Sequence, residues 1–199
     1  MPSLLDSPVT LAMIVFNLLL SVPAFFSPGL LRSLALEPYV ISHDHSYYRI
    51  ITAGFVHANT LHLALNMIAL VFFGPVMEEM VLDATGSRAG YAIIYAVALL
   101  AGNIYPFLRY RRTPNYIALG ASGAVSGIVL AFCLAEPTRM LHVFFFPMPA
   151  WLYAILFMGY TWYAMRSIKD GIAHEAHLAG AVGGMLAAFV ATPQIISFL

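Results

Sequence analysis

The sequence is poor in charged residues. Only 9% of its 199 residues are Asp, Glu, Lys or Arg, whereas 61% are hydrophobic and the mean hydropathy is +0.85. Soluble domains carry about 25% charged residues, so this composition cannot cover a water-soluble globule of this length. The nine basic and nine acidic residues balance, and a nucleic-acid-binding protein would need a basic excess. The composition excludes a soluble enzyme, a disordered chain and a nucleic-acid-binding protein, and it indicates an integral membrane protein.

Cysteine and targeting signals are also scarce. Cys133 is the single cysteine, so no intramolecular disulfide can form and the redox compartment stays open. The first eight residues have Asp6 as their sole charge, whereas a signal peptide needs a basic start and a small-residue cleavage site. The first hydrophobic segment is therefore interpreted as a membrane span.

Two well-known catalytic motifs are incomplete. Ala124 stands where the Gly-x-Ser-x-Gly elbow of soluble hydrolases needs its second glycine. His174 and His177 are three residues apart, so the His-Glu-x-x-His zinc motif is not reproduced. A metal site remains open as an alternative. Its ligands would be His57, His62, His174 and His177.

Six hydrophobic segments are long enough to span a membrane, because a hydrocarbon core of ~30 Å needs about 20 apolar residues per helix. The predicted spans are residues 9–26, 60–80, 90–107, 117–135, 149–165 and 171–191. In the long first connection, residues 30–36 are amphipathic and suit an interfacial helix, and residues 38–49 are expected to be irregular. The predicted fold is an all-α polytopic membrane protein with six transmembrane helices and a long structured first loop, forming one membrane domain over residues 1–199.

Polar residues gather in the first turns of the second, fourth and sixth spans. His62 and Asn66 lie in the second span, Ser122 in the fourth and His177 in the sixth. Even-numbered spans all enter from the same membrane face, so a rise of 1.5 Å per residue gives these side chains a common depth of ~5–10 Å. Ionisable groups inside a bilayer are costly and indicate function. We expect one polar site near one membrane surface.

Glycine spacing predicts that the fourth and sixth spans touch. Gly123 and Gly127 form one Gly-x-x-x-Gly motif, and Gly180 and Gly184 form another. Such motifs let membrane helices approach closely. His177 shares a helix stripe with the second pair, and Ser122 directly precedes the first. A contact between the two motifs would therefore bring Ser122 towards His177.

This arrangement has the chemistry of a serine hydrolase. A serine is a weak nucleophile until a base takes its proton, and a nearby histidine is the usual base. The tetrahedral intermediate needs hydrogen-bond donors, and the candidates are the Ser122 N–H and the side chains of His62 and Asn66. Glu175 lies two residues from His177 and faces another side of the helix. The predicted site is a Ser–His dyad.

At this point the sequence resembles the rhomboid family of intramembrane serine proteases. Residues 120–123 match the family's Gly-x-Ser-Gly, residues 176–180 its Ala-His-x-x-Gly, and residues 62–66 its His-x-x-x-Asn. The resemblance implies that Ser122 is the nucleophile, that His177 is the general base, and that His62 and Asn66 are oxyanion-hole side chains. It also assigns supporting positions to His57, Gly120, Gly123, Gly180, Gly184, Glu78 and Arg49.

One position departs from the family pattern. Some rhomboids have an aromatic residue four positions after the nucleophile, stacked beside the histidine, and Ser126 stands there in this chain. Both catalytic residues are present, however, and inactive relatives typically lack one or both. The chain resembles the basic six-span bacterial form, with neither a soluble domain nor a seventh span.

The resemblance implies an endopeptidase that cuts transmembrane segments of other proteins and needs no metal or organic cofactor. Its partners would be transmembrane substrates and the lipid bilayer, with no nucleic acid; the oligomeric state stays open. Two alternatives remain. One is a six-span transporter or channel with an ion or proton path along the His/Ser/Asn layer, and the other is a catalytically inactive rhomboid-like protein that binds membrane clients.

The distribution of basic residues bears on orientation. The resemblance implies a bacterial inner membrane, with the active site open to the extracytoplasmic side and both termini in the cytoplasm. The positive-inside rule points the other way, because seven basic residues fall on the site side of the membrane and two, Arg88 and Arg139, on the far side. The seven are Arg32, Arg49, Arg109, Arg111, Arg112, Arg166 and Lys169.

Overall fold

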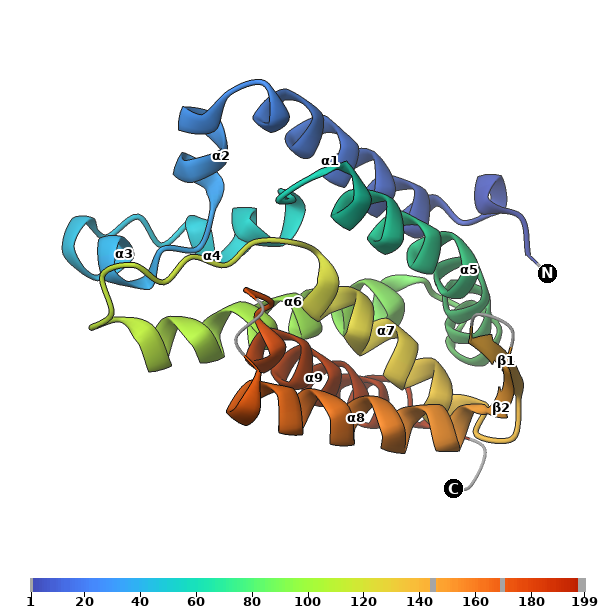
Figure 1. The fold of residues 1–199 in the computed structure, drawn as a ribbon. Coiled ribbons are helices and arrows are strands. Elements are labelled where there is room, and N and C mark those ends of the chain that lie inside the picture. The colour runs from blue at the N-terminus through green and yellow to red at the C-terminus, as the bar shows by residue number, and fades with distance from the viewer. Residues whose placement is uncertain (1, 144–145, 169–170, 197–199) are drawn as a thin grey trace.

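The computed structural model describes residues 2–143, 146–168 and 171–196, and most of its elements are helices (Figure 1). Lys169 lies outside the described residues. Three of the described α-helices begin with a proline, whose missing N–H would have no partner in the first helical turn. In chain order the elements are η1 (Leu4–Asp6), α1 (Pro8–Phe25), α2 (Pro28–Leu34), α3 (Pro38–Asp44), α4 (Arg49–Thr52), η2 (Ala53–Phe55), α5 (Thr60–Thr85), α6 (Ala89–Tyr110), α7 (Ser122–Ala135), β1 (Met140–Val143), β2 (Phe146–Pro149), α8 (Ala150–Ser167), α9 (His174–Ala191) and η3 (Pro193–Ile195).

The helices follow the predicted hydrophobic segments. Helices α1, α5 and α6 are long and apolar enough to cross a membrane, and α7 is a shorter apolar helix. Helices α8 and α9 each have 18 residues and begin within three residues of the fifth and sixth predicted spans. The prediction of a helical membrane bundle is confirmed. That all six segments cross the membrane stays a prediction.

The fourth predicted span begins later than expected. Residues 117–121 are not helical, because their backbone bonds to the first loop: Ala118 and Leu36 form an antiparallel bridge with N–O distances of 2.9 and 3.0 Å. Helix α7 therefore begins at Ser122 itself. The antiparallel pair β1–β2, which joins α7 to α8, is a further feature that the hydropathy pattern did not predict.

Helix α7 forms the centre of the bundle. Nearly all of its residues are buried, and it packs against α5, α6, α8 and α9 (Figure 1). Its glycines make this possible: a Cβ on Gly180 would overlap the Gly123 backbone, and a Cβ on Gly184 would overlap the Gly127 backbone. The two Gly-x-x-x-Gly motifs thus lie against each other, as expected from their spacing.

A buried carboxylate holds α1 against α5. Glu78 is 1% exposed, and its oxygens accept the backbone N–H groups of Val9 at 3.1 Å and Thr10 at 2.8 Å. These are first-turn N–H groups that have no acceptor within their own helix. Arg88 Nε lies 3.0 Å from the same carboxylate, and Gly74 gives room for the Thr10 side chain. Glu78 caps α1 and pairs with the loop that follows α5.

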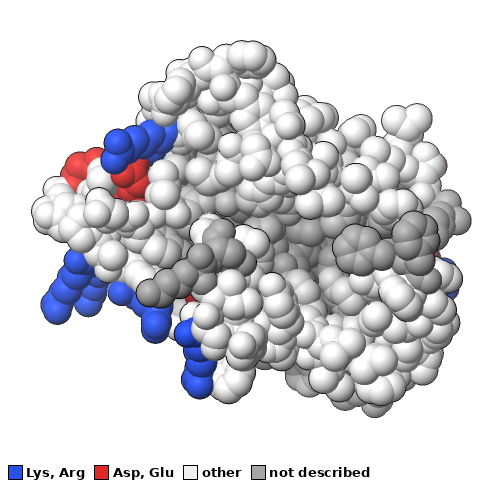
Figure 2. Space-filling model, viewed as in Figure 1, with Lys and Arg blue, Asp and Glu red and all other residues white. Residues whose placement is uncertain are grey.

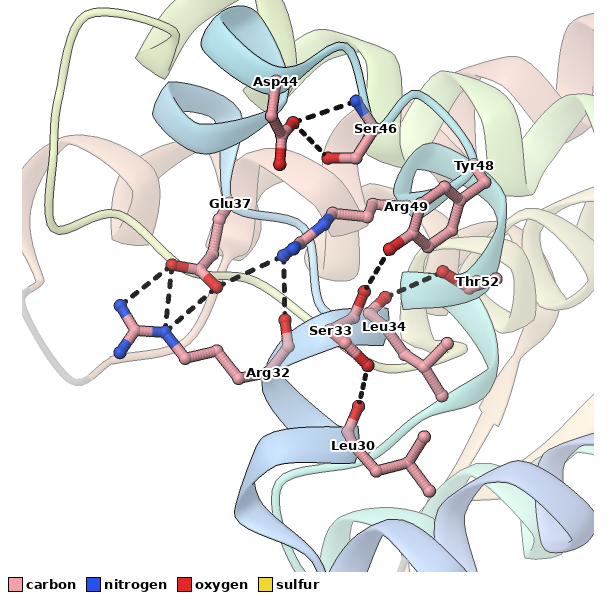
Figure 3. Close-up of polar contacts among 10 residues, drawn as sticks. All are labelled: Leu30, Arg32, Ser33, Leu34, Glu37, Asp44, Ser46, Tyr48, Arg49 and Thr52. Carbon is pink, nitrogen blue, oxygen red and sulfur yellow. Dashed lines mark hydrogen bonds and ion pairs between the residues drawn. The ribbon is translucent and has the colours of Figure 1, made fainter.

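The first loop is more regular than expected. Residues 38–49 were predicted to be irregular, but Pro38 begins helix α3, because its fixed φ and missing N–H suit a first helical turn. Figure 3 shows how α4 then holds α2. Tyr48, Arg49 and Thr52 donate from their side chains to the last carbonyls of α2, at 3.2, 2.9 and 2.9 Å. Those carbonyls have no partner inside their own helix.

An ion pair completes this loop. Arg49 Nη1 lies 3.3 Å from Glu37 Oε1, and both side chains are nearly buried, at 11% and 8% exposed. Arg32 pairs with the same carboxylate from the solvent side. On the face drawn in Figure 2, charged side chains gather at the end where α2, α3 and α4 lie, and the described residues visible in the middle of this face are uncharged. Such a surface suits a protein whose middle lies in lipid.

Candidate active site

Ser122, the first residue of α7, and His177, the fourth residue of α9, meet at the end of the bundle where the first loop lies. Ser122 Oγ lies 2.7 Å from His177 Nε2, and both side chains are partly buried. The glycine contact between the two helices brings them together, since Gly123 follows Ser122 and Gly180 lies one turn after His177. The distance is that of a short hydrogen bond. Such geometry allows the Oγ proton to pass to Nε2.

The backbone before Ser122 is held at three successive points. Beyond the Leu36–Ala118 bridge, the Gly120 N–H donates to the Ala53 carbonyl at 2.9 Å, and the Ala121 N–H donates to His57 Nε2 at 3.3 Å. Gly120 has a φ of +119°, a conformation that L side chains rarely adopt. This turn directs the chain from the extended segment into α7 and sets where Ser122 lies.

His57 connects the Ser122 turn to α1. Because the Nε2 atom of His57 accepts from the Ala121 N–H, its Nδ1 atom carries the ring proton. This Nδ1 lies 2.8 Å from Ser21 Oγ, and the Ser21 hydroxyl donates to the Phe55 carbonyl at 2.9 Å. The ring is fully buried. Burial, together with the neighbouring His62, lowers the pKa of His57 to about 3. His57 is therefore neutral at physiological pH and acts as a fixed hydrogen-bonding group.

His62 and Asn66 lie on one face of α5, as their spacing predicts. The Asn66 amide donates to the His62 carbonyl at 2.9 Å, which uses one of its two N–H groups. The His62 ring lies against Gly120, where a Cβ would come within 2.7 Å of Nε2. It also meets the His57 ring edge-on, with centroids 5.0 Å apart. The ring thus reaches the turn that leads into Ser122.

The sequence also matches a known protein family. A family model for the rhomboid domain matches residues 44–194. This chain belongs to the rhomboid family. The match includes the Ser122 turn, the paired glycine motifs and the His57–Asn66 segment. The resemblance noted from the motifs is confirmed, and the protein is a membrane protein.

Three relatives illustrate the range of this rhomboid's family. RHOMBOID-like protein 12, mitochondrial, of Arabidopsis thaliana is 32% identical over 78% of this chain and 51% of the relative. YdcA of Bacillus subtilis, named as a candidate rhomboid protease, is 28% identical over 72% and 67%. Rhomboid protein 1, mitochondrial, of Saccharomyces cerevisiae is 28% identical over 69% and 40%. The chain thus spans about half of the first relative's length and even less of the yeast protein's.

The ring beside the rhomboid's His177 comes from its own helix. His174 meets His177 edge-on, with centroids 6.0 Å apart and planes at 90°, and Tyr160 of α8 meets His174 in the same way at 5.8 Å. Aromatic pairs prefer this geometry and these distances. Sequence reasoning considered His174 only in metal-binding roles, in an incomplete zinc motif and as a ligand of the alternative metal site, and so missed its contact with His177. The signal that could have found this contact is a second histidine one turn before His177.

Glu175 is engaged away from the dyad. Its Oε1 accepts a hydrogen bond from the Tyr116 hydroxyl at 2.7 Å, and the Tyr116 ring stacks on Tyr110 with centroids 3.9 Å apart. Burial, and then the Glu175 carboxylate, raise the pKa of Tyr116 above its usual range. This pair ties the segment before Ser122 to the first turn of α9, the helix of His177.

The alternative of a histidine metal site finds no support in the described part of the chain. Across residues 2–143, 146–168 and 171–196, no group of three or more His, Cys, Asp or Glu side chains could hold a metal ion. The four histidines form two edge-on pairs, His57 with His62 and His174 with His177.

Two of the predicted residues, Glu78 and Arg49, lie away from Ser122 and His177 and stabilise other parts of the fold. Glu78 is sixteen residues beyond His62 along α5, about 24 Å at 1.5 Å per residue, and Arg49 holds the first loop. Ser21, Leu36 and Ala53 also position the Ser122 turn, and sequence reasoning missed them. A serine inside the first hydrophobic segment was the one available signal.

Proposed function

We propose that this rhomboid is an intramembrane serine endopeptidase with Ser122 as nucleophile and His177 as general base. The observation that carries the proposal is the 2.7 Å separation of Ser122 Oγ and His177 Nε2. The name of the Bacillus relative, a candidate rhomboid protease, supports the same activity. A Ser–His pair at hydrogen-bond distance is the general arrangement for activating a serine.

The reaction follows from the two side chains. Ser122 Oγ attacks the carbonyl carbon of the scissile bond while its proton moves to His177 Nε2, which forms a tetrahedral oxyanion. When the intermediate collapses, the C–N bond breaks and His177 returns the proton to the leaving amine. Water then attacks the acyl-enzyme, giving its proton to His177, and Ser122 leaves with a proton as the acid product forms.

The oxyanion needs donors already in place. Ser122 is the first residue of α7, and the first N–H groups of a helix have no acceptor within it and carry partial positive charge. The His62 ring beside Gly120 and the second N–H of Asn66 complete the set we propose. The proton transfer that we propose uses Ser122 and His177 as a dyad.

The substrates we propose are transmembrane segments of other proteins. A helical peptide bond is shielded by its own hydrogen bonds, so the segment must unwind locally to reach Ser122. The dyad lies at the ends of α7 and α9 where the first loop also lies, so water can reach it from the nearer membrane surface. We propose that six segments, 9–26, 60–80, 90–107, 117–135, 149–165 and 171–191, cross the membrane and place the site at this depth.

The test is cleavage of a reporter transmembrane helix by the purified protein in detergent or liposomes. The wild type should cut it, and Ser122→Ala and His177→Ala should each abolish cleavage. A fluorophosphonate should label the wild type and not Ser122→Ala. A wild type that neither cleaves nor labels, yet binds the reporter, would support an inactive client-binding protein. Ion or proton flux that persists in Ser122→Ala would support a transporter.

We propose that the protein lies in a bacterial plasma membrane with the active site facing the extracytoplasmic side. This orientation follows the family, whereas the basic residues favour the reverse. Arg32 and Arg49 pair with Glu37, so they contribute less to the excess of positive charge on the site side of the membrane. Other, exposed arginines remain on that side. Fusions to the C-terminus decide it: a cytoplasmic fluorescent reporter should be active and an exported phosphatase inactive, and the opposite pattern would overturn the orientation.

A further inference from the structure

A groove runs along the outer side of the contact between α6 and α9. Its volume is about 550 Å³, and its walls are formed by large apolar side chains. Ala101 and Gly183 form its floor, where a Cβ on Gly183 would lie 2.6 Å from the Ala101 Cβ. Among the walls are Ile104, Leu108, Leu178 and Val182. The groove does not include Ser122 or His177, and it belongs to a different face of α9 from the dyad.

The depth of the groove in the membrane favours a lipid acyl chain as its occupant. Helix α6 is one of the helices long and apolar enough to span a membrane, so a groove on its outer side opens to the hydrocarbon region. The lining residues of α9 extend from Glu175 to Leu186, about 16 Å at 1.5 Å per residue. That length accommodates the upper part of a lipid tail.

Arginines stand at the surface end of the groove. Tyr105 and Leu108 line it. Arg109 follows Tyr105 by four residues and so continues the same side of α6, and Arg112 comes two residues after the helix ends. Arg109 lies 5.6 Å from the centre of the Tyr110 ring, and its Nε donates to the Tyr110 hydroxyl at 3.3 Å. These contacts fix the guanidinium of Arg109 beside the Tyr110 ring, one turn beyond Tyr105 of the groove lining.

A third helix adds to the rim of the groove. Met165 of α8 lines the groove, and the next residue, Arg166, stacks over Trp162 at 4.1 Å. Arg109, Arg111, Arg112 and Arg166 are exposed. Among the described residues, carboxylates pair with Arg32, Arg49 and Arg88 and with none of these four. Figure 2 shows basic side chains gathered at this end of the molecule.

One carboxylate also borders the groove. Glu175 lines its surface end but is 6% exposed, and its Oε1 is bonded to Tyr116. The arginines outnumber it, so the rim is basic. The apolar groove matches the uncharged tail of an amphiphile, and the arginines at its surface end match an anionic headgroup. Guanidinium groups bind phosphate through paired N–H donors, and basic pockets between membrane helices bind anionic headgroups.

We propose that this groove is a binding site for an anionic phospholipid. One acyl chain lies between α6 and α9, and the phosphate-bearing headgroup lies against Arg109 and Arg112, with Arg166 at its side. The site is separate from the dyad, and the proposal does not depend on the proposed protease activity.

The test measures which lipids the protein retains. The full chain is reconstituted in nanodiscs of equal phosphatidylglycerol and phosphatidylcholine, released into mild detergent, and examined by native mass spectrometry. The wild type should retain phosphatidylglycerol at least about tenfold over phosphatidylcholine, which corresponds to 1.4 kcal/mol. The double variant Arg109→Gln/Arg112→Gln should lose most of this preference, and Arg139→Gln at the other end should keep it.

A second variant tests the groove itself. Ala179→Phe places a ring among the lining residues and should reduce retention of phosphatidylglycerol several-fold, with an unchanged unfolding temperature in detergent. Equal retention of the two lipids by the wild type would overturn the proposal, as would a double variant that behaves like the wild type. Retention unaffected by Ala179→Phe would overturn the assignment of the acyl chain to the groove.

Discussion

Gly180 packs directly on the backbone of Gly123, and this contact sets the distance between the two side chains of the dyad. A Cβ on Gly180 would overlap the Gly123 carbonyl. Ser122 directly precedes Gly123, and His177 lies one helical turn before Gly180. The 2.7 Å separation of Oγ and Nε2 therefore depends on how closely two backbones approach.

Gly180→Ala should separate α7 from α9 and break the hydrogen bond of the dyad. We expect the rate of fluorophosphonate labelling of Ser122 to fall about a hundredfold, since small misplacements cost this much. The free energy of unfolding should fall by about 1–3 kcal/mol through overpacking. The matched control is Gly159→Ala in α8, where an added methyl meets no atom within 4 Å. A Gly180→Ala protein that labels like the wild type would contradict this account.

His57 should govern the acid stability of the protein. Its folded pKa of about 3 lies below the unfolded value of ~6.5, so the unfolded state binds more protons between these pH values. Stability conferred by neutral His57 is full above pH ~6.5 and falls as the pH drops towards 3, by at most about 1.4 kcal/mol per pH unit. Denaturation curves across this range should show the slope in the wild type.

His57→Gln provides the comparison. The Gln side chain can still accept from the Ala121 N–H but does not titrate, so the acid slope should become shallower while part of the activity remains. His57→Ala leaves that N–H without its acceptor and removes one of the two partners of Ser21 Oγ, at a cost of about 1–3 kcal/mol. An unchanged acid slope in His57→Gln would assign the acid sensitivity to other groups.

His174 should affect turnover more than substrate binding, because its ring contacts the proposed base. His174→Ala removes the ring edge-on to His177, so we expect kcat to fall about tenfold to a hundredfold with KM little changed. His174→Phe restores a ring and should recover most of the activity. Equal loss in both variants would show that the ring contact is not what matters.

Glu78 should matter for stability and not for chemistry. Glu78→Gln removes the charge that accepts two N–H groups of α1 and pairs with Arg88, at a cost of about 1–3 kcal/mol. Glu79→Gln, at the exposed neighbouring position, should change stability by no more than about 0.5 kcal/mol. Activity per folded molecule should be the same in both. A selective loss of turnover in folded Glu78→Gln would show coupling from this end of α5 to the dyad.

Much of this protein follows from local pattern. The scarcity of charge identifies a membrane protein, and five of the helices begin within three residues of their predicted spans. Ser122, His177 and the glycine pairs were identified because a polar layer at one depth and the spacing of small residues are properties of the chain. Periodicity and membrane thickness act on consecutive residues, so they can be read without a structure.

The remainder depends on contacts between distant segments. Helix α7 begins at Ser122 and not at residue 117, because the backbones of Leu36 and Ala53 form hydrogen bonds with the residues before Ser122. The tautomer of His57 depends on Ser21 and Ala121, and Tyr160 meets His174 only because α8 packs against α9. The sequence alone determined the membrane bundle and which side chains could form a dyad. Tertiary structure decided how that dyad is held, because hydrogen bonds between segments far apart leave no periodic pattern in the chain.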